Sequence, residues 1–304
     1  MTALLTNHKY LNRTLSLLAI FVLFLCLDRI LSGLIQQALF RSSFRYSLLY
    51  RGAVDADIVV LGNSRGTSSV YVPAIEQATS MKCFNLSYNG MGAQELVEVL
   101  KDFLKYNRKP KLILLEASCI TTSSPSNLSP FWKYSEGLSD NAKLQMPVSF
   151  YAGEVIGLYR LNAEMTYRAL YYLNRSDQGY ANRRVASSSK FSDAEDSSRI
   201  KLETPSEEGM LPVCELLEIA RSNQISVYVY LAPYHPEYSK RIENLDEWVA
   251  KYRSFIGETP FLDMSRSVSE SDCFADRLHN NWKAIPAIVQ SMNRFGVFSG
   301  ISEF

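Results

Sequence analysis

The stretch Asp57-Ile-Val-Val-Leu-Gly-Asn-Ser-Arg-Gly66 decides the fold of this chain. Residues 57–62 form a continuous apolar run, which predicts a strand buried on both faces of a sheet. A Gly-rich turn begins directly after the run, and Ser64 stands in that turn. A serine at this place is either a nucleophile presented at the end of a strand or a residue that caps the next helix or turn.

Working outward, the same rhythm of strand, turn and helix continues along the chain. Further strands are expected at 83–87, 111–117, 226–232 and 260–264, and helices at 72–79, 93–106, 211–222 and 236–255. Apolar strands that alternate with amphipathic helices predict an α/β fold, with a parallel sheet and helices on both of its faces.

The segment from about 118 to 208 interrupts this rhythm and is too long for an ordinary loop. It opens with a Ser/Thr/Pro-rich loop, continues into a Tyr-rich helical stretch around 151–172, and ends in a polar, Ser-heavy piece at 175–208. The sequence leaves open whether this insertion is a lid, a substrate-binding subdomain or a disordered excursion.

The N-terminus reads as a membrane anchor. Lys9 and Arg13 precede an uncharged apolar run at 14–27, which can be extended past Asp28 and Arg29 to residue 36. This pattern predicts a cytoplasmic tail at 1–13, a transmembrane signal anchor at 14–36, a juxtamembrane linker at 37–56 and a domain at 57–304. A cleaved signal peptide is the competing interpretation. Basic residues flank both ends of the run, so the positive-inside rule does not decide the orientation.

Composition narrows the class of protein. The 304 residues carry a net charge of +1, which leaves no electrostatic footprint for nucleic acid. The five cysteines are widely spaced without a CxxC pair, and we expect them to be reduced and structural. A zinc site built on Cys273 and His279 lacks ligands, and no phosphate-binding Gly loop is present, so neither a metal nor another cofactor is expected.

The polar residues that follow the expected strands form the candidate site. Open parallel sheets bind ligands at the carboxyl ends of their strands, where this chain carries Asn63-Ser64-Arg65, Asn89-Gly90 and Ser118. Asp276 and His279 stand three residues apart, a spacing that lets the carboxylate hold one ring nitrogen while the other faces Ser64. His235 is expected in a loop that borders the pocket.

Three of these segments resemble the SGNH (GDSL-like) hydrolase superfamily. Gly62-Asn-Ser-Arg65 looks like its first block, Asn85-Leu-Ser-Tyr-Asn-Gly90 its second, and Asp276-Arg-Leu-His279 its fifth. The resemblance implies a flavodoxin-like parallel sheet, with Ser64 as nucleophile, His279 as base and Asp276 as the residue that orients it. It also implies that the backbone N–H groups of Ser64 and Gly90 donate to the oxyanion.

One block departs from the family pattern. The third block usually supplies an Asn side chain as a further oxyanion donor, and this chain has Glu116-Ala-Ser-Cys-Ile120 there. The loss of one such donor costs about 10²–10³ in rate. Either Asn63, Asn89, Arg65 or Ser118 replaces it, or the activity is weak or absent.

An anchored SGNH-like domain without this Asn is similar to cell-envelope acylation proteins, such as the alginate-type O-acetylation proteins and the D-alanyl transfer protein of teichoic acid synthesis. That resemblance implies a single-pass protein of the cytoplasmic membrane with its domain on the periplasmic or extracytoplasmic side. Its partners would be membrane lipid, a polysaccharide or other envelope polymer, and a membrane-bound acyl-donor protein. The first hypothesis is therefore a serine-dependent O-acyltransferase or acylesterase acting through an acyl-Ser intermediate. The alternatives are a non-catalytic binding or assembly module and a secreted lipase or thioesterase.

Overall fold

A computed structural model describes residues 2–120, 125–161, 163–176 and 198–299 of the chain. Most of the Ser-heavy piece of the predicted insertion, at 177–197, and part of its opening loop, at 121–124, lie outside the described residues.

The centre of the fold is a sheet of five parallel strands in the order β2-β1-β3-β4-β5. This is the order of flavodoxin-like folds, which the resemblance to SGNH hydrolases implies. Each strand lies inside its expected range: β1 (Ile58–Leu61), β2 (Cys83–Asn85), β3 (Leu112–Glu116), β4 (Ser226–Leu231) and β5 (Phe261–Asp263).

Both faces of the sheet are buried, which explains why the strands are apolar at almost every position. Val59 and Leu61 of β1 belong to one hydrophobic cluster, whereas Ile58 and Val60 belong to a second cluster on the opposite face. Each fully buried side chain of this size stabilises the fold by about 1.5–3 kcal/mol.

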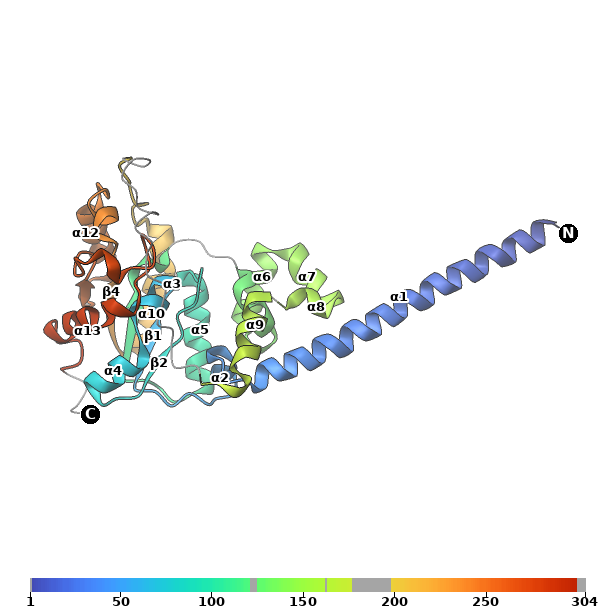
Figure 1. Ribbon diagram of the computed structural model, residues 1–304, viewed down its shortest axis with the longest axis horizontal. Coiled ribbons are helices and arrows are strands. Elements are labelled where there is room, and N and C mark those ends of the chain that lie inside the picture. The colour runs from blue at the N-terminus through green and yellow to red at the C-terminus, as the bar shows by residue number, and fades with distance from the viewer. Residues whose placement is uncertain (1, 121–124, 162, 177–197, 300–304) are drawn as a thin grey trace.

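Helices cover the two faces as separate layers (Figure 1). The first cluster is completed by α2 (Arg45–Tyr50), α5 (Ala93–Tyr106), α10 (Glu207–Ser222) and α12 (Leu245–Ile256). The second is completed by α4 (Val72–Thr79) and α13 (Ile285–Arg294). The bounds of α4 and α5 match the sequence-based expectation.

The prediction of a single helix at 236–255 is wrong, because the structure has two helices there, α11 (Pro236–Ser239) and α12. Between them, Ile242 pairs with Ile200 in a parallel bridge, and Arg241 donates to the carbonyl of Ser198. The end of the insertion therefore binds to this turn and stops the helix there.

The segment expected to be a juxtamembrane linker contains α2, which is packed into the core. The Tyr46 hydroxyl donates to the carbonyl of Leu86 at 2.6 Å, and the Arg45 guanidinium donates to the carbonyl of Ser87 at 2.9 Å. Residues 45–50 thus support the turn after β2.

The N-terminal helix α1 (Thr2–Arg41) projects from the domain (Figure 1). Within it, Asn12–Arg41 is long and apolar enough to cross a membrane, and only 6% of its most apolar window is buried. Length and composition make it a candidate for a single span, and an N-terminal signal sequence meets the same criteria.

From residue 125 to residue 174 the described part of the insertion is mostly helical, and its helices lie between the sheet domain and α1 (Figure 1). After η1 (Ala117–Ile120) and η2 (Pro125–Tyr134) it forms α6 (Glu136–Gln145), α7 (Pro147–Val155), α8 (Gly157–Arg160), α9 (Ala163–Tyr171) and η3 (Tyr172–Asn174). The remaining short helices are α3 (Ser64–Ser69), η5 (Ser271–Cys273) and η6 (Trp282–Ala284).

Gly62 closes the strand that leads to Ser64, and we expect Gly62→Ala to lower the stability of the domain by about 1–3 kcal/mol. An added Cβ would lie 2.7 Å from Cβ of Glu116 and 3.3 Å from Oγ of Ser87, both of which are buried. Chemical unfolding of the two proteins measures the change. Gly33→Ala is the matched control because its Cβ would meet nothing within 4 Å, and an equal effect of both substitutions would contradict the steric explanation.

Candidate active site

Ser64 is the first residue of α3 and directly follows the turn after β1. The Asn63 side chain caps this helix, with its Oδ1 accepting a hydrogen bond from the backbone N–H of Arg65 at 2.9 Å. The cap fixes the start of α3 and therefore the direction in which Ser64 leaves the backbone.

Asp276 and His279 lie in a tight turn ahead of α13. Oδ1 of Asp276 accepts the backbone N–H groups of Leu278 and His279, each at 2.9 Å. Nδ1 of His279 lies 2.9 Å from both carboxylate oxygens. With the ring proton on Nδ1, this contact leaves Nε2 as an acceptor.

The two segments meet at the carboxyl edge of the sheet. Nε2 of His279 lies 2.8 Å from Oγ of Ser64, across 215 residues of sequence. Hydroxyl, imidazole and carboxylate are thus joined by hydrogen bonds in the order that activates a serine nucleophile.

Asp276 is held ionised by its partners. Partial burial alone would raise the pKa of this carboxyl, but hydrogen bonds from His279 and from the backbone N–H of Leu278 outweigh burial and lower the pKa to about 2. A carboxyl group with a lowered pKa stabilises the fold at pH above its ordinary value of 3.8, and that contribution is lost as pH falls toward 2.

We therefore expect His279→Ala to raise the pKa of Asp276 toward its ordinary value, because the hydrogen bond from the imidazole disappears. Carboxyl-carbon NMR titration of the two proteins measures this shift. Asp55, whose lowered pKa depends on Lys82 and Arg108, provides an internal reference that should not move. An Asp276 pKa that stays near 2 in the variant would exclude His279 as the cause.

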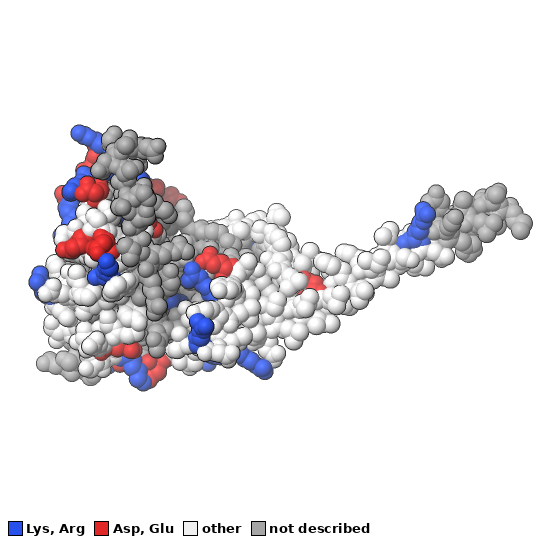
Figure 2. Space-filling model, in the orientation of Figure 1, with Lys and Arg blue, Asp and Glu red and all other residues white. Residues whose placement is uncertain are grey.

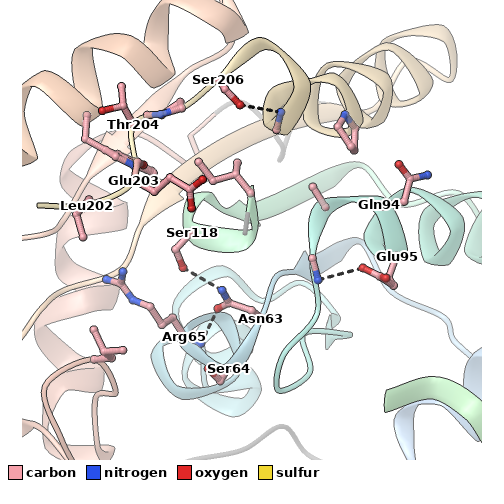
Figure 3. A pocket seen from close by; sticks show the side chains of 18 of the residues that line it. Asn63, Ser64, Arg65, Gln94, Glu95, Ser118, Leu202, Glu203, Thr204 and Ser206 are labelled. Atoms are coloured by element: carbon pink, nitrogen blue, oxygen red, sulfur yellow. Dashed lines mark hydrogen bonds between the residues drawn. The ribbon is translucent and has the colours of Figure 1, made fainter. Parts of the chain in front are cut away.

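Ser118, which occupies the region of the missing third-block Asn, is already engaged. Its Oγ donates to Oε2 of Glu116 at 2.5 Å and accepts from Nδ2 of Asn63 at 3.0 Å. The side chains of Ser118 and Asn63, both named as candidate oxyanion donors, therefore bind each other in this structure (Figure 3).

The Arg65 side chain lines the pocket, is almost fully buried and points away from the Ser64 hydroxyl (Figure 3). Its guanidinium donates to the carbonyl of Ala232, lies 3.9 Å from Glu116 and stacks on the ring of Tyr234 at 3.7 Å. Glu116 is fully buried and also accepts the backbone N–H groups of Ser118 and Ala232. The ion pair ties the turn that carries Ser64 to the ends of β3 and β4.

This role of Glu116 was not predicted from the sequence. The signal was an acidic residue at the end of the apolar run Leu112-Ile-Leu-Leu-Glu116, because a carboxylate in a buried strand requires a cation or several donors.

Gly90 lies in the turn between β2 and α5 with φ of +69°, a conformation that favours glycine. The described residues that line the pocket include Gly92, Ala93 and Gln94 from the start of α5, but neither Asn89 nor Gly90.

His235, expected at the border of the pocket, is buried and does not line it. Its Nδ1 accepts the N–H of Glu237 at 3.3 Å, and its backbone N–H donates to the carbonyl of Arg277 at 3.2 Å. It therefore supports the loop that holds Asp276 and His279. Burial lowers the pKa of His235, which keeps the ring neutral against the side of Phe274.

Ser64 and His279 line a pocket of about 770 Å³. Figure 3 shows the side of this pocket that holds Asn63, Ser64 and Ser118. The start of α5 forms one wall, and residues 202–209, at the end of the insertion, form the opposite wall. Trp248 anchors that second wall by donating its Nε1–H to the carbonyl of Glu203 at 3.0 Å. Residues 202–209 were not identified from the sequence as part of the site.

Among the described residues, no group of three His, Cys, Asp or Glu side chains could hold a metal ion, and all five cysteines are free.

No family model matches the chain, and no curated protein matches it at a significant level. Similar solved structures include a candidate platelet activating factor from Streptococcus pneumonia, which is 13% identical with a TM-score of 0.42 over 92% of this chain and 98% of that chain. A GDSL-like lipase from Bacteroides thetaiotaomicron is 11% identical with a TM-score of 0.40 over 87% and 98% of the two chains. TesA is 10% identical with a TM-score of 0.39 over 79% and 97%. At this level of similarity, none of their activities transfers to the chain.

Proposed function

We propose that this chain is a serine-dependent acylesterase or O-acyltransferase of the SGNH type. The observation that carries the proposal is the hydrogen-bonded series Ser64–His279–Asp276 at the mouth of a pocket. The order of the three groups and their contacts of 2.8 and 2.9 Å meet the geometric requirement for a general base acting on a serine nucleophile.

In the proposed reaction, Oγ of Ser64 attacks the carbonyl carbon of an ester while Nε2 of His279 takes the hydroxyl proton. The tetrahedral oxyanion collapses, the alcohol leaves with the proton from His279, and acyl-Ser64 remains. A second hydroxyl, from water or from an acceptor, gives its proton to Nε2 of His279 and attacks the acyl carbon. The bond between that carbon and Oγ of Ser64 then breaks, and His279 returns the proton to Oγ. Asp276 keeps the ring in the tautomer required at both stages.

We further propose that the acceptor is a cell-envelope or extracellular polysaccharide, and that α1 anchors the domain outside the cytoplasmic membrane. Two features support this finer proposal. The pocket is large enough for more than one sugar-sized group, and its second wall comes from the insertion rather than from the sheet. The apolar run of α1 supports the anchor. A membrane-bound protein would supply the acyl group.

A second candidate function is a catalytically weak or inactive binding module of a polysaccharide assembly. The observation that favours it is the hydrogen-bonded series Asn63–Ser118–Glu116, which occupies two of the side chains that could replace the missing oxyanion donor, Asn63 and Ser118.

Intact mass of the full-length protein after incubation with p-nitrophenyl acetate distinguishes the two functions. The catalytic proposal predicts a gain of one acetyl group that is absent in Ser64→Ala and retained in Ser254→Ala, an exposed serine of α12. Adding an oligosaccharide acceptor then separates transfer from hydrolysis, because only transfer yields an acetylated sugar. A folded wild-type protein without an adduct would favour the binding module.

A further inference from the structure

Helices α7 and α8 are hydrogen-bonded to two charged residues within the apolar part of α1. Asp28, which is buried, accepts the backbone N–H groups of Gly157 at 2.7 Å and Leu158 at 3.0 Å. The neighbouring Arg29 donates to the carbonyls of Glu154 and Val155 at 2.6 and 2.9 Å. The only charged residues between Arg13 and Arg41 are thus bound to the ends of these two helices.

The length of the apolar run of α1 determines how deep in a bilayer the contact of α1 with α7 and α8 would lie. At 1.5 Å per residue, the run 14–27 spans only about 21 Å, whereas a hydrocarbon core of about 30 Å requires roughly 20 residues. A span that begins at Thr14 therefore continues to about Gly33, past Asp28 and Arg29. The bilayer then reaches the part of α1 on which α7 and α8 lie.

The outer surfaces of α7 and α8 suit that depth. Large apolar or aromatic side chains are exposed along them, with Val148 exposed to 83%, beside Tyr151, Val155 and Tyr159. Their charged residues are Glu154 and Arg160, and these form an ion pair with each other. Tyrosines are enriched where a protein crosses the interface between water and lipid.

Exposed apolar residues are also present on the part of α1 against which these helices pack. Ile30, Leu31 and Leu34 are exposed on the part of α1 beside the contact. Figure 2 shows that charged residues gather over the sheet domain, whereas the surface where the helical insertion meets α1 is almost free of them. An exposed apolar surface of this kind marks an interaction site, and its contact with the proposed membrane span identifies the occupant as lipid.

We infer that α7 and α8 dip into the interface of the membrane leaflet on the side of the domain, and so hold the domain at a fixed height and tilt. In this arrangement, α1, α7 and α8 together contact the membrane, and the domain is not connected to the span by a flexible linker alone. This inference rests on the proposed membrane span and is independent of the proposed catalysis.

The test uses the full chain in phosphatidylcholine vesicles, with an environment-sensitive fluorophore attached to the single thiol that Val148→Cys introduces. Cys26→Ser and Cys214→Ser remove the accessible native thiols, because Cys83, Cys119 and Cys273 are buried. Leu211→Cys, on α10 of the sheet domain and exposed to 66%, is the matched control. Lipids with a nitroxide near the head group should quench the label at position 148 roughly twofold or more and leave that at position 211 nearly unchanged, as for a helix lying in the interface.

Native Cys26, labelled in a protein that carries only Cys214→Ser, reports on the span itself because it is exposed on α1. If nitroxides deep in the acyl chains quench the label at Cys26 but the label at position 148 is not quenched, α7 and α8 do not lie in the interface. The proposed membrane span of α1 would still hold. Crosslinking of position 148 to a protein in native membranes, without lipid quenching, would replace lipid by a protein occupant. If lipid nitroxides quench neither label, both the membrane span of α1 and the interfacial position of α7 and α8 are contradicted.

Discussion

Ser64→Ala and His279→Ala are each expected to reduce the rate of p-nitrophenyl acetate hydrolysis by about 10⁴-fold or more, because both groups act in the same step. The distance of 2.8 Å between Oγ of Ser64 and Nε2 of His279 leads to a sharper expectation. Combining the substitutions should cost little more than either alone, since a nucleophile without its base is already inactive. Steady-state kinetics of the three variants measures both effects.

Two further variants control this prediction. Asp276→Asn keeps the shape of the side chain but removes the carboxylate that holds the His279 tautomer, and a loss approaching 10⁴-fold is expected. Ser254→Ala removes an exposed serine hydroxyl that donates to the carbonyl of Lys251 and does not line the pocket, and should keep full activity. Equal activity of wild type and Ser64→Ala would refute the catalytic proposal.

The largest loss of stability is expected for Glu116→Ala, at about 3–5 kcal/mol, the usual cost of breaking a buried ion pair by removing one partner. Arg65 would then keep its charge in the interior beside Tyr234, with the carbonyl of Ala232 as its main remaining partner. The N–H groups of Ser118 and Ala232 would also lose an acceptor. Denaturant unfolding of the domain measures the change in the free energy of unfolding.

Glu116→Gln separates charge from shape. The amide oxygen can still accept one of these N–H groups, so a smaller loss than for alanine is expected if hydrogen bonding carries much of the stability. Glu258→Ala, on the exposed end of the same domain, is the matched control and should change the free energy of unfolding by less than about 0.5 kcal/mol. A loss for Glu116→Ala no larger than for Glu258→Ala would contradict a structural role for the buried pair.

Strand positions and most helices of the sheet domain could be predicted because they depend on local composition. A strand buried on both faces, such as Ile58–Leu61, must be apolar throughout, and an amphipathic helix such as Ala93–Tyr106 carries its own spacing. The break between α11 and α12 could not be predicted, because residues 198–200 cause it from outside the segment.

The candidate site was predictable to the extent that its residues follow strands or stand close together in sequence. Ser64, Asp276 and His279 are of this kind. His235 was misplaced because its loop turns its ring inward against Phe274 rather than toward the pocket. The hydrogen bond between Asn63 and Ser118 could not be predicted for a similar reason. Ser118 is held by Glu116, which in turn forms an ion pair with the buried Arg65.

The sequence by itself determined the strands, their parallel arrangement, the apolar N-terminal run and the residue types able to activate a serine, because periodicity and residue chemistry are local properties. Only the tertiary structure decided that Ser64 and His279 meet, that residues 202–209 form a wall of the pocket, and that α7 and α8 bind Asp28 and Arg29. Each of these contacts joins segments far apart in the chain, where no local pattern records the partner.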